Sequence, residues 1–266
     1  MKANLKYIGW GLFCIGVIIA MRFTKKSHEE RVMDFPEIVL ETPQDNVFLS
    51  SEDVKERLVK KGIKIESIQR KELNTGFIEQ VLVEMPEIEE AKVYASLSGE
   101  WTISGKIRRP VARVFNTRGE SYYLDDKGKK MPLSPIYTAR VIPVTGKVRD
   151  KLYDPDINEI INNDSLKSIS LLPQIYAITN YVCNDAFLHA QITQIHIEEN
   201  GDFVLIPRVG MQQIVFGKID DEAVIKERFD KLKIFYREAM PFAGWGKYET
   251  INLKFKKQIV CTKRSL

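Results

Sequence analysis

The first apolar segment of the chain runs from Tyr7 to Met21 without a charged residue. With Lys6 and Arg22 reaching outward at its ends, residues 7–23 are long enough for a helix across a hydrocarbon core of roughly 30 Å. The segment ends in Ile18-Ile19-Ala20-Met21-Arg22, which lacks the small residues of a signal-peptide cleavage site. We therefore predict an uncleaved transmembrane helix.

Charged residues on both sides of this helix leave its orientation open. Residues 1–6 form a short tail with two lysines, whereas residues 24–34 are polar, rich in charge and without apolar periodicity. The positive-inside rule, applied literally, would leave the large body in the cytoplasm. We expect residues 24–34 to form a linker between the helix and the body.

Residues 35–113 alternate between strand and helix patterns. We predict elements in the order β-α-α-β-β, bounded by caps, glycines and a proline. They are a strand at Glu37–Glu41, a helix from Ser50 to Gly62, a helix from Phe77 to Met85, and a hairpin of residues 91–97 and 101–107.

Residues 114–266 predict a second, mostly antiparallel β domain with two helices, so the fold class is α+β. Arg109-Pro110 marks the joint, because proline forces the residue before it into an extended conformation. Helical periodicity occurs at Leu171–Val182 and from Asp220 to Pro241, while the hairpin signal Asn200-Gly201 separates two strands. The last element is predicted as one strand from Ile251 to about Thr262.

Composition excludes several classes of protein. The chain has 266 residues, 44% of them hydrophobic, and a net charge of +4, so it folds and has no basic surface of the kind that binds nucleic acid. The three cysteines Cys14, Cys183 and Cys261 are too far apart for a disulfide framework. Whether Cys183 and Cys261 pair stays open, with free thiols as the simpler expectation.

Candidate catalytic and metal-binding groups fail on spacing. The loop from Asp154 to Asn158 opens like a calcium loop but has Glu159 where the turn needs glycine. His189 and His196 would lie on opposite faces of one strand. The pairs Glu89-Glu90 and Asp125-Asp126 are interpreted as solvated ends of elements. No nucleophile, metalloprotease or phosphate-loop motif occurs, so we expect no catalytic residue, cofactor or metal.

Four motifs carry a resemblance to a known family: RRPVAR at 108–113, YYLDDKG at 122–128, MPLS at 131–134 and TARVIPVTG at 138–146. In this order they resemble the bacterial cell-division proteins of the FtsQ/DivIB family. The resemblance implies a POTRA-like domain at 35–113, a β domain at 114–266, and a single-pass protein of the inner membrane with a periplasmic body. The family often has an acidic residue where this chain has Arg108, which leaves an ion pair there open.

The resemblance also implies a partner site on the terminal strand. In FtsQ-like proteins the final strands receive the division proteins FtsB and FtsL, here by addition of a strand to an edge. The residues expected to bind are Leu253, Lys254, Phe255, Lys256, Lys257, Gln258, Ile259, Val260 and Cys261. The lysines favour an acidic partner, although they could equally protect an ordinary edge strand from aggregation, with Lys257 pointing inward.

Three functions follow from these patterns. The preferred one is a non-enzymatic scaffold that docks other division proteins during septum formation and has no small-molecule substrate or nucleic-acid partner. One alternative is a membrane-tethered envelope hydrolase or transferase with a scattered site. The other is an export or assembly chaperone that uses its POTRA-like domain to bind extended polypeptides.

Overall fold

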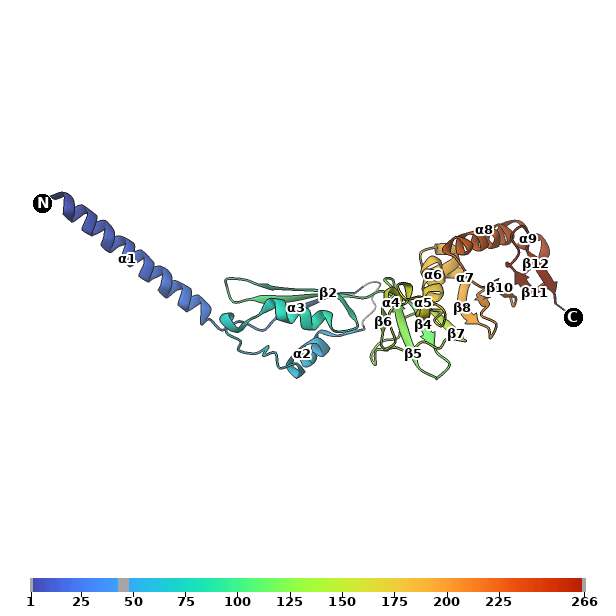
Figure 1. The fold of residues 1–266 in the computed structure, drawn as a ribbon, viewed down its shortest axis with the longest axis horizontal. Helices are drawn as coiled ribbons and strands as arrows, with labels where there is room; N and C mark the ends of the chain where they lie inside the picture. Colours follow the sequence, from blue (N-terminus) through green and yellow to red (C-terminus); the bar gives the residue numbers. More distant parts are fainter. Residues whose placement is uncertain (1, 43–47, 265–266) are drawn as a thin grey trace. The chain divides into compact units, whose positions relative to one another are not determined.

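The computed structural model describes residues 2–42 and 48–264, without the side chains of residues 2–9, 11, 12, 27 and 28. The chain forms two compact units, Met1–Ile107 and Arg108–Leu266, whose elements are labelled in Figure 1. Strand β4 (Pro110–Phe115) pairs with β5 and β7 of the second unit. The division therefore lies before Arg108 rather than after Arg113, because all of β4 belongs to the second sheet.

The first unit begins with α1 (Lys2–Glu29), a helix of 28 residues. Large apolar side chains along it are exposed, among them Trp10, Phe13 and Phe23. Among the described residues, no helix combines the length and apolar character needed to cross a membrane. The helix predicted at residues 7–23 falls partly on side chains outside the described ones.

The predicted linker at residues 24–34 is not a free linker. Thr24–Glu29 continue helix α1, and Val32 then forms an antiparallel bridge with Gln69. The Met33 side chain is only 3% exposed. The expectation was wrong because a polar stretch with one buried methionine gives no periodic signal.

The body of the first unit has the predicted β-α-α-β-β order, with a short 3-10 helix added. Its elements are β1 (Glu37–Glu41), α2 (Ser51–Lys60), η2 (Arg70–Glu72), α3 (Thr75–Val83), β2 (Ile88–Ala95) and β3 (Trp101–Ile107). The strands form a sheet in the order β1-β3-β2. Helix α2 begins with the predicted capping box, in which the Ser50 hydroxyl accepts from the Asp53 N–H at 3.1 Å.

The second unit is built on a nine-stranded sheet in the order β12-β11-β10-β9-β8-β7-β4-β5-β6. After β4 its strands are β5 (Ser121–Asp125), β6 (Lys130–Met131), β7 (Ile142–Gly146), β8 (Ile192–Ile197), β9 (Phe203–Pro207), β10 (Gln213–Gly217), β11 (Tyr248–Asn252) and β12 (Val260–Lys263). Five of the eight pairings between neighbouring strands are antiparallel and three are parallel. The sheet is thus mixed.

Helices of the second unit pack on one face of this sheet, as Figure 1 shows for α6 and α8. The described helices are α4 (Ile157–Ile161), α5 (Asp164–Lys167), α6 (Leu172–Cys183), α7 (Ala186–Gln191), α8 (Glu222–Glu238) and α9 (Met240–Ala243). Sequence periodicity predicted α6 and α8, whereas the other four are one or two turns long and too short to show a period. Ile178 on α6 and Phe229 on α8 are fully buried in the core against the strands.

Candidate functional site

The C-terminal segment forms a hairpin at the edge of the second sheet, not the single strand predicted from Ile251 to Thr262. Strand β11 pairs with β10 on one side and with β12 on the other, and residues 253–259 connect β11 to β12. The Asn252 side chain ends β11 by accepting the Lys254 N–H at 3.0 Å, a turn that competes with strand pairing. The Lys231 ammonium then donates to the carbonyls of Leu253, at 3.2 Å, and Phe255, at 2.7 Å.

This turn divides the predicted binding residues into two groups. Leu253 is fully buried, as its alternation with Ile251 predicted. Phe255 was expected to face the core but is 44% exposed, because the chain has left the sheet there. Ile259 and Cys261 pack partly against the core, whereas Gln258 is exposed and Val260 is 41% exposed.

The three lysines of the segment differ in their surroundings. The Lys254 ammonium bonds the carboxylate of Asp202 at 2.9 Å, and the Asp202 side chain is only 8% exposed. The Lys254 stem covers Gly217, where an added Cβ would lie 2.5 Å from Lys254 Cγ. Lys256 and Lys257 are exposed, so Lys257 does not point inward. Lys254 is therefore a structural residue, and the other two lysines remain available to a partner.

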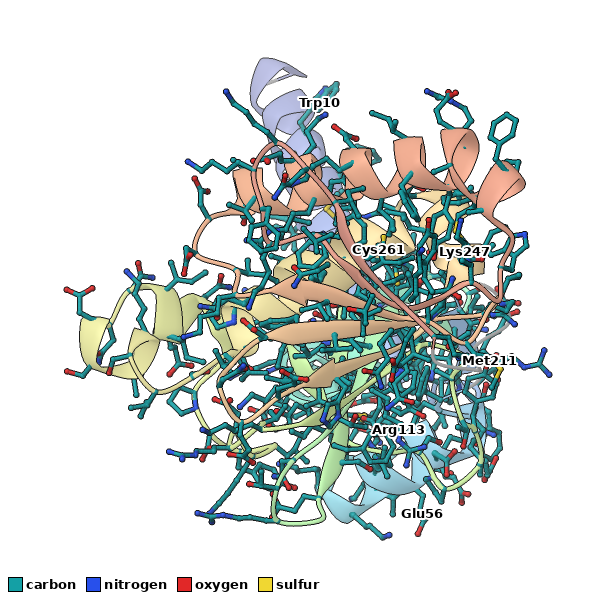
Figure 2. The ribbon with its side chains drawn as sticks, turned by 90° about the vertical axis from the view of Figure 1, so that its right-hand side faces the viewer. Trp10, Glu56, Arg113, Met211, Lys247 and Cys261 are labelled. Carbon is teal, nitrogen blue, oxygen red and sulfur yellow. The ribbon has the colours of Figure 1, made fainter. Side chains whose placement is uncertain are left out.

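Strand β12 is the outermost strand of the described sheet, with a neighbour on its inner side only. In an antiparallel pair, alternate residues direct their N–H and C=O groups away from the neighbour. The end of β12 is held by Arg264, whose N–H donates to the Lys247 carbonyl at 3.0 Å and whose guanidinium donates to the Met211 carbonyl at 3.3 Å. Lys247, Met211 and Cys261 are labelled in Figure 2. The arrangement presents a fixed strand edge with exposed Val260 and Thr262 side chains.

Comparison with protein families matches both units of the chain. A model described as FtsQ/DivIB, C-terminal related matches residues 109–262, more than half of the 266 residues. The chain belongs to the FtsQ/DivIB family. A POTRA-like domain model matches residues 36–104, while a comparison with curated proteins found no match. These domains indicate a role in cell division, in a family whose members are in general not enzymes.

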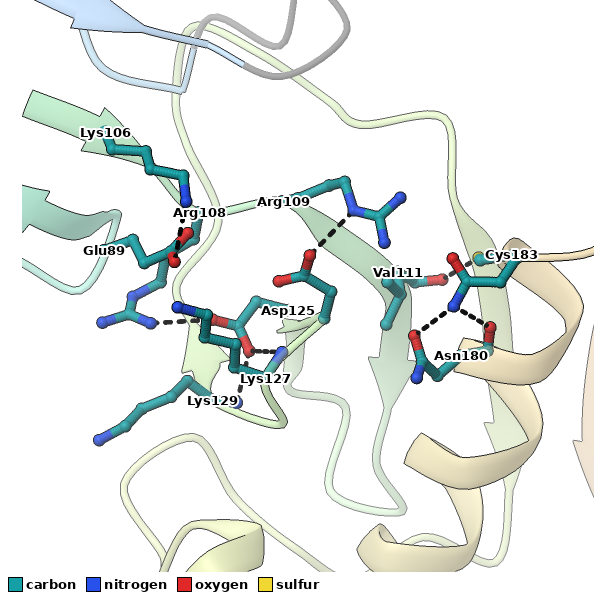
Figure 3. Close-up of polar contacts among 12 residues, drawn as sticks. Glu89, Lys106, Arg108, Arg109, Val111, Asp125, Lys127, Lys129, Asn180 and Cys183 are labelled. Carbon is teal, nitrogen blue, oxygen red and sulfur yellow. Dashed lines mark hydrogen bonds and ion pairs between the residues drawn. The ribbon is translucent and has the colours of Figure 1, made fainter.

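A buried ion pair begins the second unit of this FtsQ/DivIB chain, at the position where the family often has an acidic residue. Arg108 Nη1 donates to Asp125 Oδ2 at 2.9 Å, and the same carboxylate accepts the N–H groups of Lys127 at 3.0 Å and Lys129 at 2.6 Å (Figure 3). Burial raises the pKa of Asp125 although Arg108 opposes the shift. The ion pair left open by the sequence is therefore present.

The predicted solvation of the paired acidic residues was wrong at two positions. Asp125 is fully buried, and the Glu89 side chain is 6% exposed and pairs with Lys106 at 3.2 Å. Asp126 keeps partial exposure in its ion pair with Arg109 at 3.0 Å, and Glu90 is exposed as predicted. The error arose because adjacent acidic residues on a turn or strand end resemble solvated charges unless their basic partners, 17 residues away in the sequence, are known.

The loop that opens like a calcium site holds a lysine ammonium instead. Lys130 Nζ donates to the carbonyls of Lys151, at 2.6 Å, and Asp154, at 2.9 Å. Burial lowers the pKa of Lys130, against the attraction of nearby carboxylates that includes Asp150. Together with Lys129, whose ammonium lies 3.2 Å from the Asp156 carboxylate, Lys130 places positive charge where a calcium loop would hold its ion.

The histidines occupy different elements, contrary to the expectation that one strand carries both. His189 lies in α7, whereas His196 lies in β8 and its Nδ1 is 3.0 Å from the Thr145 hydroxyl. Within residues 2–42 and 48–264, no group of three or more His, Cys, Asp or Glu side chains could hold a metal ion.

Cys183 and Cys261 are both free thiols. The Cys183 thiol donates to the Val111 carbonyl at 3.3 Å (Figure 3), and burial raises its pKa to about 11. Burial also raises the pKa of Cys261. Cys183 and Cys261 therefore form no disulfide in this structure, and their raised pKa values make both thiols poor nucleophiles.

One polar cleft of the second unit gathers two acidic residues. It has a volume of about 450 Å³, lies between α6 and α8, and includes Asp185 and Glu222 in its lining. Burial would raise the pKa of Asp185, but the ammonium of Lys233 and the Leu188 N–H hold it below its usual range. Asp185 is thereby engaged as the cap of α7, which leaves it no role as a general acid.

Proposed function

We propose that this chain is a cell-division scaffold that binds partner polypeptides by strand addition to β12. The observation that carries the proposal is the position of β12, which is outermost in the described sheet and is fixed at its end by Arg264. A partner strand gains main-chain hydrogen bonds from such an edge, and its side chains meet Val260 and Thr262. The FtsQ/DivIB match over residues 109–262 favours this scaffold over an envelope hydrolase, a transferase or an export chaperone.

The expected partners are division proteins of the FtsB and FtsL type. Lys256 and Lys257 are exposed beside β12 and without an ion pair among the described residues, which favours an acidic partner segment. Leu253 and Lys254 support the site from within. The function includes no catalytic step, cofactor or small-molecule substrate.

The same proposal includes a membrane anchor. Helix α1 exposes Trp10, Phe13, Ile18 and other large apolar side chains, which in water would be unfavourable and in lipid would be buried. The amino terminus then lies in the cytoplasm and both units lie in the periplasm of the inner membrane, anchored by a single helix. Protease accessibility in spheroplasts tests this topology, because only an extracytoplasmic body is digested from outside.

Strand addition is tested by copurification of tagged FtsB- and FtsL-type partners with full-length variants. The Arg264 N–H bonds the Lys247 carbonyl, so by alternation along β12 the Cys261 N–H points away from β11. Cys261→Pro removes this N–H and should abolish capture, whereas Cys261→Ser keeps the main chain and should retain it. The double variant Lys256→Glu with Lys257→Glu should weaken capture, most strongly at low salt. Undiminished capture by a folded Cys261→Pro variant would exclude strand addition at β12.

A further inference from the structure

Three segments of the first unit meet directly after helix α1. The Arg70 N–H donates to the Arg31 carbonyl at 3.0 Å, the Met33 N–H to the Ile68 carbonyl at 2.9 Å, and the Asp34 N–H to the Gly99 carbonyl at 3.0 Å. The chain that leaves α1 is therefore paired at once with the η2 region and with the tip of the β2–β3 hairpin. A free tether between helix and domain does not exist here.

These segments present a surface that we call the helix-proximal patch, formed by Arg31, Val32, Arg70 and Leu97. Leu97 is 72% exposed and Val32 is 54% exposed. Arg70 Nη1 donates to the Ser96 carbonyl at 2.6 Å, and Arg31 packs over Gly99, where an added Cβ would lie 3.1 Å from Arg31 Nε. Both guanidinium groups thus lie beside the hairpin tip that carries Leu97.

The patch lies close to the end of the apolar part of α1. From Thr24 to Glu29 the helix adds six residues, about 9 Å at 1.5 Å per residue. Arg31 follows Glu29 by two residues, which span about 7 Å at most. At the tilt of about 40° that is the upper range for membrane helices, the rise of about 9 Å shortens to about 7 Å. This equals the depth of about 5–7 Å of the headgroup layer on each side of the hydrocarbon core, so the patch lies at the outer edge of this layer when residues 30 and 31 run along the membrane surface.

The side chains of the patch match the chemistry of that layer. Leucine and valine gain from transfer out of water, and a guanidinium binds a phosphate with two parallel hydrogen bonds. Net positive charge is not the driving force, since acidic residues are also present. Glu29 and Glu30 lie 3.8 and 3.9 Å from Lys25 and Lys26, and Glu100 accepts from Ser98.

We propose that the helix-proximal patch is a second membrane contact, in which Leu97 and Val32 enter the headgroup layer and Arg31 and Arg70 bind lipid phosphates. This inference rests on the proposed membrane anchoring by α1. A lipid surface is favoured over a polypeptide partner because the patch is joined to α1 by two residues. The contact fixes the height of the first unit above the membrane.

The test uses the full-length chain, with its three cysteines replaced by serine, reconstituted in phosphatidylcholine vesicles. A fluorophore is attached at Leu97→Cys or, as a control, at Val83→Cys. Val83 is 46% exposed and ends helix α3, which precedes the start of β2, whereas Leu97 follows the end of β2. Spin-labelled lipid headgroups should quench the probe at position 97 several-fold more than the probe at 83. Because phosphatidylcholine already supplies phosphates and Glu100 lies close to the two arginines of the patch, added anionic lipid should change the ratio less than about twofold.

Flotation with the vesicles distinguishes membrane anchoring by α1 from membrane contact by the helix-proximal patch. If the chain floats but position 97 is quenched no more than position 83, the second contact is excluded while the anchor stands. If the chain does not float, anchoring and patch both fail. Quenching that occurs only with anionic lipid would contradict insertion of the apolar side chains. Loss of quenching in the double variant Arg31→Gln with Arg70→Gln would confirm the contact with lipid phosphates.

Discussion

Arg108 and Asp125 form an ion pair at 2.9 Å in which the arginine side chain is 11% exposed and the aspartate side chain 1% exposed. The neighbouring Arg109 and Asp126 form a second pair at 3.0 Å with 32% and 28% exposure. The first residues of the second unit are therefore attached to the β5–β6 turn twice, once in the interior and once near the surface (Figure 3). The two pairs have similar geometry and differ in burial.

Replacing Arg108 by methionine should lower the free energy of unfolding by about 3–5 kcal/mol, because it leaves a buried carboxylate without its partner. The matched change Arg109→Met should cost about 1 kcal/mol or less, since solvent screens the outer pair. Urea denaturation of both variants measures the difference. Equal losses would show that burial does not distinguish the pairs.

The stability contribution of Asp125 should depend on pH. Its pKa in the folded protein is raised from 3.8 by burial, so the folded state binds this proton more tightly than the unfolded state. The resulting stability is present at low pH and is lost as the pH rises from 3.8 through the folded-state pKa. The unfolding free energy of the wild type minus that of Asp125→Asn should therefore fall as the pH rises above about 3.8. A rise over this range would contradict the assignment.

Two glycines with positive φ should respond differently to alanine. At Gly146, with φ of +96°, an added Cβ would lie 2.0 Å from the Ile197 carbonyl oxygen in the paired strand. At Gly119, with φ of +83°, no atom lies within 4 Å. Gly119→Ala should cost about 1–2 kcal/mol from backbone strain alone, and Gly146→Ala about 3 kcal/mol or more. Thermal unfolding compares them, and a similar loss at both sites would refute the close approach.

Substitution of Lys254 should lower stability, whereas substitution of Lys256 should weaken partner binding. Lys254→Met leaves the Asp202 carboxylate, 8% exposed, without its ammonium partner and should cost about 1–3 kcal/mol. Lys256→Met should change stability by less than about 0.5 kcal/mol while weakening partner binding. An unchanged unfolding free energy in Lys254→Met would show that Lys254 has no structural role and, like Lys256 and Lys257, is available to a partner.

Sequence patterns predicted much of the fold because its longer elements carry strong local signals. Ser50 and Asp53 cap α2 as predicted, and the periodicity of Ile175 and Ile178 placed α6 correctly. The end of the first unit was placed six residues late, because β4 continues the strand pattern of β3 after only two residues. The pairing of strands such as β4 with β7 depends on contacts that no local pattern records.

The local structure of the C-terminal segment was predicted only in part. Ile251 and Leu253 face the core as their alternation indicated, and Val260 lies on the outermost strand. The turn was missed because residues 251–262 contain no glycine or proline, although Asn252 is a residue that strands disfavour. The contribution of Lys231 could not be predicted, since it reaches the turn from a helix more than twenty residues away.

The most direct test of the central claim is hydrogen exchange of full-length protein in membranes, with and without the extracytoplasmic segments of FtsB- and FtsL-type partners. Binding by strand addition predicts that amides of Val260–Lys263 pointing away from β11 slow at least tenfold when the partner is added. Amides at the opposite edge, β6, should be unchanged. Protection confined to the first unit, with β12 exchanging at its free rate in the bound complex, would contradict the account.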